Sequence, residues 1–382
     1  MRVLVVHNRY RSVNPSGENR VVDDEVALLR AHGVEVRTYI LDSDEIGRPG
    51  LAVGMGPVYS RSGVRGFRTA LADRPDVVHL HNVYPLISPY VVRVAQAEAV
   101  PVVQTVHNYR HMCAAGTFYR DGHACEDCLP RRLGWPAVVH GCYRGSSLQS
   151  VPMAVGQAVH RPTWAGVDRL LPVSGFVARK LVEAGFPSDR ITVRHTGLAD
   201  PGPPAPLGRG AVYVGRLDEE KGLPLLLRAW GVADAGDTTL TIVGDGPLRA
   251  TAEDAAGSDS RIRVLGSLPP DRVRAAMNAA AVVVIPSRTY EGLPRVLIEA
   301  FAAGRPVVGA AVGALEELVP DDVGWTAPPE PAPFGAAVAS ALRSPDLADR
   351  GQRARETFLS SYSADVSMTR LLDVYREVTA GG

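Results

Sequence analysis

The stretch AVVVIPSRTYEGLPRVLIEAFAAGRPVV, residues 281–308, decides the fold. It opens on a β-branched run, Ala281 to Ile285, and passes through a loop with glycine and proline into an apolar helical pattern. It ends on a second β-branched run, Pro306 to Val308. A strand, a helix and a strand in this order are typical of a parallel sheet covered by helices. The sequence therefore predicts an α/β fold.

The same alternation recurs along the whole chain. Strands are expected in the first half at Val3 to Val6, Val34 to Ile40, Val77 to Leu80, Val102 to Val106, Arg169 to Val173 and Ile191 to Arg194. In the second half they are expected at Ala211 to Val214, Leu240 to Val243, Ile262 to Leu265, Ala281 to Ile285 and Pro306 to Val308. Between the halves, the proline-rich segment from Gly197 to Gly210 suits neither a helix nor a central strand.

We therefore predict two Rossmann-like, doubly wound domains that face a central cleft, with ligands at the carboxyl ends of the strands. The first domain spans residues 1–200 and contains a cysteine-rich insertion at 109–147. A linker at 201–210 leads to the second domain, 211–362. A C-terminal helix at 363–382 is expected to cross back onto the first domain.

Composition excludes several classes of function. The 382 residues hold 41 basic and 41 acidic side chains, so the formal net charge is zero and a nucleic-acid partner is not expected. Apolar runs are far shorter than the roughly 20 residues of a membrane-spanning helix. The apolar run at the amino terminus is shorter than that of a signal peptide, so we expect no signal peptide and a cytoplasmic protein. The oligomeric state stays open.

Three loops of the second half carry the residues that suit phosphate and sugar binding. After one strand come Gly215 and Arg216, followed by Lys221, and these cations could clamp an anion. A solvated charged turn is the alternative. The next strand runs into the glycine turn Gly244-Asp245-Gly246-Pro247, which could equally be a plain connection. In the third loop Glu291 precedes a helix that starts near Pro294 and carries Glu299, and two carboxylates at this spacing suit vicinal hydroxyls.

These motifs, together with the Ala300 to Val308 run that follows them, strongly resemble the family 4 glycosyltransferases, retaining enzymes of GT-B fold. The resemblance implies that Arg216 and Lys221 neutralise the donor diphosphate, that Glu291 contacts the transferred sugar and that Glu299 holds the ribose. It implies further donor contacts at Gly215, Asp245, Gly246, Gly292, Leu293 and Pro294, and base recognition by Gly266, Ser267 and Leu268.

In the first half, His107 ends a strand and matches the histidine of the family that hydrogen-bonds the donor sugar; a histidine that caps the core is the alternative. The resemblance places the acceptor near Gly17 and Glu18, and we add His81 and Asn108, which also end strands. Many family members have two glycines where this chain has Gly17 alone.

The four cysteines, Cys113, Cys125, Cys128 and Cys142, fall within the insertion, and the Cys125-x2-Cys128 spacing is typical of zinc knuckles. We expect a structural zinc ion; reduced buried thiols and a disulfide pair are the alternatives. Ser60 to Arg74 forms a basic amphipathic pattern. Packing against the core is expected of it, rather than membrane docking.

The expected reaction is retaining transfer of a sugar from a nucleoside diphosphate donor, with UDP as the expected nucleotide. The expected acceptor is a hydroxyl of a small polyhydroxylated molecule such as an aminocyclitol. Surface polysaccharide or glycolipid is the alternative acceptor, and a non-catalytic nucleotide-sugar-binding protein is the alternative class. No catalytic cofactor is expected, because Arg216 and Lys221 replace a cation, and Asp42 and Asp44 are interpreted as loop acids.

Overall fold

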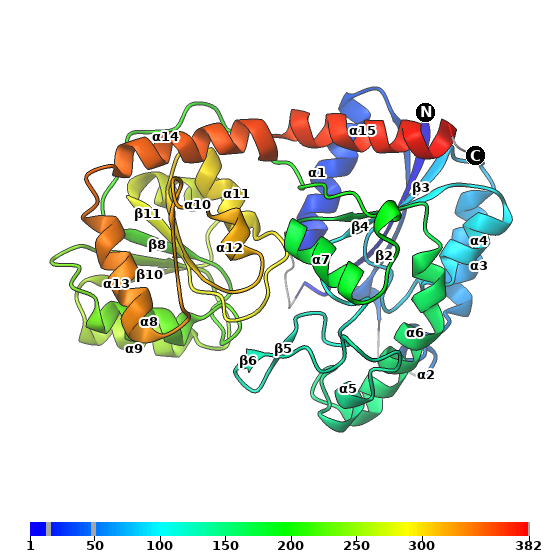
Figure 1. The fold of residues 1–382 in the computed structure, drawn as a ribbon, viewed down its shortest axis with the longest axis horizontal. Coiled ribbons are helices and arrows are strands. Elements are labelled where there is room, and N and C mark those ends of the chain that lie inside the picture. Colours follow the sequence, from blue (N-terminus) through cyan, green and yellow to red (C-terminus); the bar gives the residue numbers. More distant parts are fainter. Residues whose placement is uncertain (13–16, 47–50, 381–382) are drawn as a thin grey trace. The chain divides into compact units, whose positions relative to one another are not determined.

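The computed structural model describes residues 1–12, 17–46 and 51–380, and these form two compact units (Figure 1). The first unit holds Met1–Phe118, Cys125–Gly197 and the C-terminal residues from Ser367. The second holds Tyr119–Ala124 and Leu198–Val366. Each unit is built around its own parallel sheet.

The sheet of the first unit has the strand order β2-β1-β3-β4-β7, and all its strand pairs are parallel. The strands are β1 (Arg2–Arg9), β2 (Glu35–Asp42), β3 (Val77–Leu80), β4 (Val102–Val106) and β7 (Arg169–Pro172). Every residue of β3 and β4 is buried, as expected for central strands covered by helices on both faces. The helices are α1 (Gly17–Ala31), α2 (Leu51–Gly54), α3 (Arg61–Leu71), α4 (Val91–Ala97), α5 (Trp135–Val139), α6 (Ser147–Ala165) and α7 (Gly175–Glu183), with 3-10 turns at Ser43–Glu45 and Ser188–Arg190.

The sheet of the second unit has the order β10-β9-β8-β11-β12-β13 and is also parallel. The strands are β8 (Ala211–Val214), β9 (Leu240–Val243), β10 (Ile262–Gly266), β11 (Val282–Ile285), β12 (Val307–Ala310) and β13 (Trp325–Ala327). The helices are α8 (Leu223–Val232), α9 (Arg249–Ser258), α10 (Pro270–Ala279), α11 (Arg295–Ala302), α12 (Leu315–Leu318), α13 (Pro331–Leu342) and α14 (Leu347–Thr357), followed by a π-helical turn at Phe358–Tyr362. A small hairpin, β5 (Tyr119–Arg120) with β6 (His123–Ala124), groups with this unit.

Two segments differ from the expected strands and linker. The predicted strand at Ile191 to Arg194 is wrong, because this segment forms only an isolated bridge between Ile191 and Leu170 of β7. Its further contacts with β7 are two backbone hydrogen bonds, at Thr192 and Arg194. The predicted linker is bound to the second unit along its second half. There the buried guanidinium of Arg305 donates hydrogen bonds to the carbonyl oxygens of Ala205 and Pro206 at 2.8–3.2 Å.

The final helix, α15 (Ala364–Ala380), packs its apolar side into the first unit. Its residues Met368, Leu371, Val374 and Tyr375 are buried against the sheet residues Val3, Val5 and Val77. In α3, the apolar residues Val64, Phe67 and Leu71 are likewise buried, which confirms ordinary packing of the predicted amphipathic helix.

Helix α6 exposes more apolar surface than an ordinary surface helix. Its buried side mixes polar residues (Ser150, Gln157, His160 and Thr163) with apolar ones such as Met153, Ala154 and Trp164, whereas the exposed residues beyond Ser150 are apolar. Among the described residues, no helix is both long and apolar enough to cross a membrane.

We predict that Leu371→Ala destabilises the protein by about 2–5 kcal/mol, because it leaves a cavity at a fully buried position of α15. Chemical unfolding followed by tryptophan fluorescence measures this. Arg376→Ala on the exposed side of the same helix is the matched control and should change stability by less than about 0.5 kcal/mol. Equal effects of the two substitutions would contradict this packing.

Candidate functional site

Three loops at the carboxyl edge of the second sheet pack backbone against backbone. A Cβ added to Gly222, which follows β8, would lie 1.8 Å from the Pro286 carbonyl oxygen after β11. A Cβ added to Gly244, which follows β9, would lie 1.9 Å from the Gly215 carbonyl oxygen. Both positions also have positive φ, 77° and 143°, so glycine is required there for steric and conformational reasons. The loops after β8, β9 and β11 are therefore held together without intervening side chains.

Lys221 and Glu291 meet at this edge. The Lys221 Nζ donates to Glu291 Oε1 at 2.6 Å, and the Ser287 hydroxyl donates to the same oxygen at 2.6 Å. Burial raises the pKa of Glu291, but Lys221 and these hydrogen bonds outweigh it, so the pKa is lowered. Glu291 is therefore an anion at neutral pH and not a proton donor. Sequence reasoning found Lys221 and Glu291 but missed Ser287.

Arg216 also lies in this loop, where acidic side chains surround it. It forms an ion pair with Asp218 and a second, at 3.5 Å, with Glu220. Asp218 in turn accepts a hydrogen bond from the Lys221 backbone N–H at 2.7 Å. One carboxylate, which sequence reasoning missed, thus holds the Arg216 guanidinium and the backbone of Lys221. An anion that binds to Arg216 or Lys221 must displace the carboxylate that pairs with it.

The remaining donor residues implied by the resemblance lie on loops or helix starts at the same edge. Gly266 accepts a hydrogen bond from the Gly244 N–H at 2.8 Å, and Ser267 beside it is exposed. Glu299 in α11 pairs with Arg295 at 3.0 Å, one helical turn away. The other members of the set are Asp245, Gly246, Leu268, Gly292, Leu293 and Pro294, the last of which is the N-cap of α11. Because the strands are parallel, one edge gathers all of these residues.

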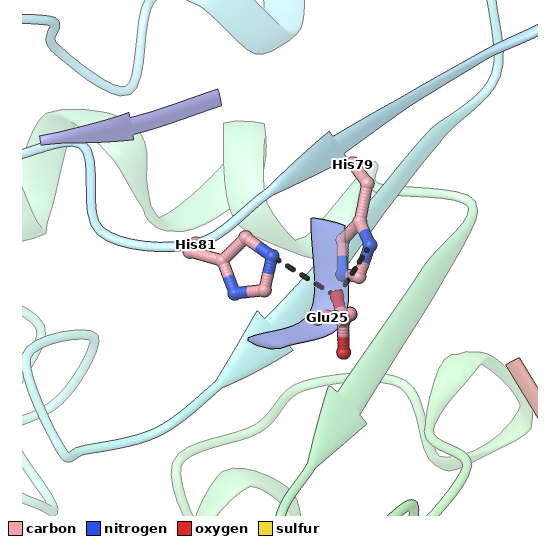
Figure 2. Close-up of side chains that lie close together, drawn as sticks. All are labelled: Glu25, His79 and His81. Atoms are coloured by element: carbon pink, nitrogen blue, oxygen red, sulfur yellow. Dashed lines mark ion pairs between the residues drawn. The ribbon is translucent and has the colours of Figure 1, made fainter. Parts of the chain in front are cut away.

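The first unit contains a buried group of which sequence reasoning had predicted only His81 as a site residue. Glu25 of α1 lies beside His79 and His81, with Oε1 at 3.3 Å from His79 Nδ1 and at 3.3 Å from His81 Nε2 (Figure 2). The other carboxylate oxygen accepts a hydrogen bond from Arg194 Nη1 at 2.5 Å. Burial raises the pKa of Glu25, but Arg194 and the histidines outweigh it, so the pKa lies well below its usual value. Glu25 and Arg194 therefore form a buried ion pair.

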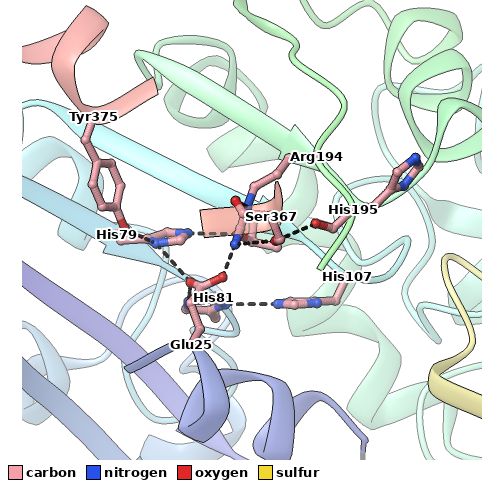
Figure 3. Close-up of polar contacts among 9 residues, drawn as sticks. Glu25, His79, His81, His107, Arg194, His195, Ser367 and Tyr375 are labelled. Atoms are coloured by element: carbon pink, nitrogen blue, oxygen red, sulfur yellow. Dashed lines mark hydrogen bonds and ion pairs between the residues drawn. The ribbon is translucent and has the colours of Figure 1, made fainter. Parts of the chain in front are cut away.

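This pair is the centre of a network that spans the unit (Figure 3). Arg194 Nη2 also donates to the Ser367 hydroxyl at 3.0 Å, and the Tyr375 hydroxyl hydrogen-bonds His79 Nδ1 at 2.6 Å. Both partners belong to α15. His81 Nδ1 and His107 Nε2 share a hydrogen bond at 2.9 Å, so the predicted His81 and His107 do lie together.

The group of Glu25, His79 and His81 has the donor atoms of a metal site, since they lie within 4.8 Å of one another. Two observations oppose a metal ion. The Arg194 guanidinium already neutralises the carboxylate, so a divalent cation would add uncompensated charge to a buried site. His79 Nδ1 is also occupied by the Tyr375 hydroxyl. The residues do not fit a metal, and we assign them to structure and to the orientation of His107.

The predicted acceptor residues Glu18 and Asn108 lie together in a second polar cluster. The Asn108 side-chain amide donates to Glu18 Oε2 at 3.2 Å, and the Tyr10 hydroxyl donates to the same oxygen at 3.1 Å. Burial raises the pKa of Glu18. The Arg110 guanidinium lies over the Tyr10 ring at 5.7 Å. An added Cβ at Gly17 would meet no atom within 4 Å, so sterics do not require glycine there; Ser16 lies outside the described residues.

The four cysteines occupy one part of the first unit, all half-buried and without disulfide bonds. Burial and the nearby thiols of the other three cysteines raise the pKa of Cys128 to about 11. Without a cation this thiol stays protonated at neutral pH. Among the described residues, the group whose ligand atoms lie close enough together to hold a metal ion is Glu25, His79 and His81, and not the four cysteines. A zinc ion at the cysteines therefore stays a prediction.

We predict about one zinc ion per chain when the protein is purified without chelators, released on Cys128→Ser substitution. Elemental analysis measures the metal, and titration of thiols in denaturant counts the cysteines. Four titratable thiols with no metal would show that these cysteines are simply reduced and partly buried.

We also predict that stability falls as the pH drops from about 6.5 toward 4. Burial lowers the pKa values of five histidines, to about 3 for His7 and about 4 for His111, and below the usual 6.5 for His79, His107 and His160. In this range the unfolded chain binds protons that the folded chain does not, so protonation favours unfolding. Urea unfolding at a series of pH values measures the slope. His111→Gln should reduce it, and a flat profile between pH 7 and 5 would contradict the assignment.

Comparison with known proteins gives matches in both halves of the chain. Residues 16–197 match the family described as "Glycosyl transferase 4-like domain", and residues 208–344 match "Glycosyl transferases group 1". A phosphatidyl-myo-inositol mannosyltransferase of Mycobacterium leprae is 28% identical over 96% of this chain and 95% of its own length. The 2-deoxystreptamine N-acetyl-D-glucosaminyltransferase of Streptomyces fradiae is 30% identical over 79% of this chain and 71% of its own length.

Among solved structures, the Anabaena protein HepE in complex with UDP is similar, with a TM-score of 0.69 at 15% identity over 99% of this chain and 100% of that one. This likeness shows the fold, two Rossmann-like domains of the GT-B type, and confirms the predicted fold class. The matches in both halves and the 30% identity over most of the chain show that it belongs to the glycosyltransferases, with a family 4-like amino-terminal domain and a group 1 carboxy-terminal domain.

Proposed function

We propose that this protein transfers a sugar from a UDP-sugar to a hydroxyl of a small polyhydroxylated acceptor such as an aminocyclitol, with retention of configuration. The observation that carries the proposal is the glycine-packed edge of the second sheet, where Lys221, Arg216 and Glu291 lie on loops that admit no side chains between them. Backbone amides at such an edge approach a diphosphate closely.

The main requirement of this reaction is that the negative charge on the leaving group is stabilised. The donor diphosphate would take Lys221 and Arg216 from the carboxylates that hold them, and these two cations would stabilise the charge that develops on the departing phosphate. The resemblance assigns Glu291 to the transferred sugar and Glu299 to the ribose. Because the protein's own cations meet the leaving group, we propose that catalysis needs no metal ion.

The bond changes balance without a protein nucleophile. The bond between the anomeric carbon and the phosphate oxygen breaks, and the acceptor oxygen forms its bond on the same face of the sugar. The acceptor proton passes to the departing phosphate oxygen. Burial and, to a lesser degree, electrostatic repulsion from neighbouring His81 keep the pKa of His107 well below its usual value, so His107 is neutral and can hydrogen-bond a sugar hydroxyl without adding charge.

The acceptor side is supported by the cluster around Glu18 and by the Streptomyces fradiae relative, whose name gives 2-deoxystreptamine as its acceptor. A carboxylate at this position suits an amine or hydroxyl group of a cyclitol. A second candidate is a glycolipid acceptor. The exposed apolar side of α6 favours it, and the Mycobacterium leprae relative is named for a phosphatidylinositol substrate.

The experiment that tests this function incubates the purified protein with UDP-sugars and a panel of cyclitols, with and without EDTA. Proton NMR of the product reads the anomeric configuration directly. Release of UDP with an α-linked product from an α-linked donor would support retention, and an inverted product would refute it. Donor binding in thermal shift without any turnover would support a non-catalytic binding protein instead.

We predict that Lys221→Ala and Glu299→Ala each lower kcat/KM for the donor by on the order of 10²-fold, since each removes a charge-assisted hydrogen bond worth roughly 1.5–3 kcal/mol. Steady-state kinetics with varied donor measure this. Arg343→Ala is the control, because Arg343 pairs with Asp234 on the exposed surface of the same unit. Wild-type kinetics in either site variant would contradict the assignment.

A further inference from the structure

Beyond its first turn, which exposes Ser147 and Gln149, the outward side of α6 is apolar. Leu148, Val151, Val155 and Val159 have exposed fractions of 82%, 41%, 37% and 42%, and their spacing of three or four residues places them in one stripe. From Leu148 to Val159 the stripe is roughly 17 Å long at 1.5 Å per residue. A free surface helix of a soluble domain normally presents polar residues on its exposed side.

Hydrogen bonds from the buried side of α6 hold the helix in the orientation that exposes the apolar stripe. His160 Nε2 hydrogen-bonds the Val58 carbonyl at 2.7 Å, and Thr163 accepts a hydrogen bond from Arg93 Nε at 2.8 Å. Gln157 Nε2 donates to the Arg110 carbonyl at 2.8 Å. These bonds fix the rotation of the helix, so the apolar stripe faces outward. Gln157 also ties the helix to the loop that holds Asn108 and the Glu18 cluster.

Neighbouring elements enlarge this apolar surface. Gly156 of α6 packs so closely on the segment before α3 that an added Cβ would lie 2.5 Å from the Pro57 carbonyl oxygen. Helix α5 packs beside α6 (Figure 1). Both neighbours expose large apolar or aromatic side chains: Met55, Tyr59, Leu133, Trp135 and Val139. We call these residues and the α6 stripe the apolar face.

The two chain segments that form the apolar face contain basic residues but no acidic ones. Neither residues 46–72 nor residues 129–167 contain an aspartate or glutamate, although the whole chain has 41 acidic residues. The exposed basic residues in these two segments are Arg61, Arg65, Arg68, Arg131, Arg132 and Arg144. Arg131 lies over the Trp135 ring at 5.6 Å, which joins a cation to an exposed aromatic side chain.

We propose that the apolar face docks onto the surface of a membrane rich in anionic lipids, with α6 parallel to the membrane plane. The apolar stripe would enter the boundary between headgroups and acyl chains, and the arginines would contact lipid phosphates. Trp135 and Tyr59 are of the residue types that favour this boundary. A second copy of the chain suits the face less well, because a symmetric contact would place the same unbalanced arginines opposite one another.

The proposal goes beyond the proposed function and is tested without donor or acceptor. The full-length protein is floated with vesicles of phosphatidylcholine alone and with vesicles that contain phosphatidylglycerol. We expect binding to the anionic vesicles, weak binding to the neutral ones and a loss of binding at high salt. Leu148→Glu/Val151→Glu should lower partitioning at least tenfold, and Arg131→Gln/Arg132→Gln should lower it roughly fivefold for each arginine removed.

Val232→Glu is the matched control, because Val232 is 64% exposed on the second unit and the substitution has the same chemistry. It should bind vesicles as the wild type does. An unchanged melting temperature would show that the α6 variant is folded. Absence of binding to anionic vesicles overturns the proposal. So does a dimer in sedimentation that Leu148→Glu/Val151→Glu dissociates, which would assign the face to a second copy, or equal vesicle binding by wild type and this variant.

Discussion

Parallel pairing of the strands is the constraint on which the rest of this structure depends. Each strand must return to the same edge through a helix, so the carboxyl ends of all strands in a sheet open on one side. In the second unit this edge collects the loops after β8, β9 and β11, and the close backbone contacts at Gly222 and Gly244 leave no space between them. In the first unit the same edge collects Asn108, His107 and His81. The chemistry of both units is a consequence of this geometry.

Charge in both units is balanced before any ligand binds. In the second unit Lys221 is held by Glu291, and Arg216 by Asp218. The cations of these pairs are 34% exposed at Lys221 and 39% exposed at Arg216, so another anion can reach them. In the first unit the Glu25–Arg194 pair is buried, where breaking it would leave an uncompensated charge. The pairs in the second unit can therefore exchange a carboxylate for a ligand anion, which fits the proposed donor site. The buried pair in the first unit is suited to a structural role.

Helix α6 connects two surfaces of the first unit with different roles. Its inner side hydrogen-bonds the Arg110 carbonyl in the loop of the proposed acceptor cluster, and its outer side is part of the apolar face. Polar side chains are stable inside because each finds a partner, and apolar side chains outside are favourable once a partner covers them. The same helix would thus hold the acceptor loop at a defined distance from a membrane surface.

The local sequence pattern determined much of the fold and the candidate donor site. The bounds of β3 and β4 followed from short β-branched runs, and Lys221 and Glu291 were found because their loops follow recognisable strands. The segment at Ile191 was predicted as a strand because its β-branched residues satisfy the pattern, whereas its pairing with β7 amounts to an isolated bridge and two backbone hydrogen bonds. Propensity describes a single residue, but a strand exists only when a neighbour pairs with it.

The tertiary structure alone decided the buried network and the outward face of α6. Glu25 lies 169 residues before Arg194, and Arg194 lies 173 residues before Ser367, so no local spacing indicates that they meet. In α6 the apolar residues have helical periodicity, which is equally typical of a buried side. Which side faces inward was settled by hydrogen bonds to Val58, Arg93 and Arg110 from other elements. Hydrophobic periodicity is a local property of the chain, whereas charge pairing and burial depend on residues that only folding brings together.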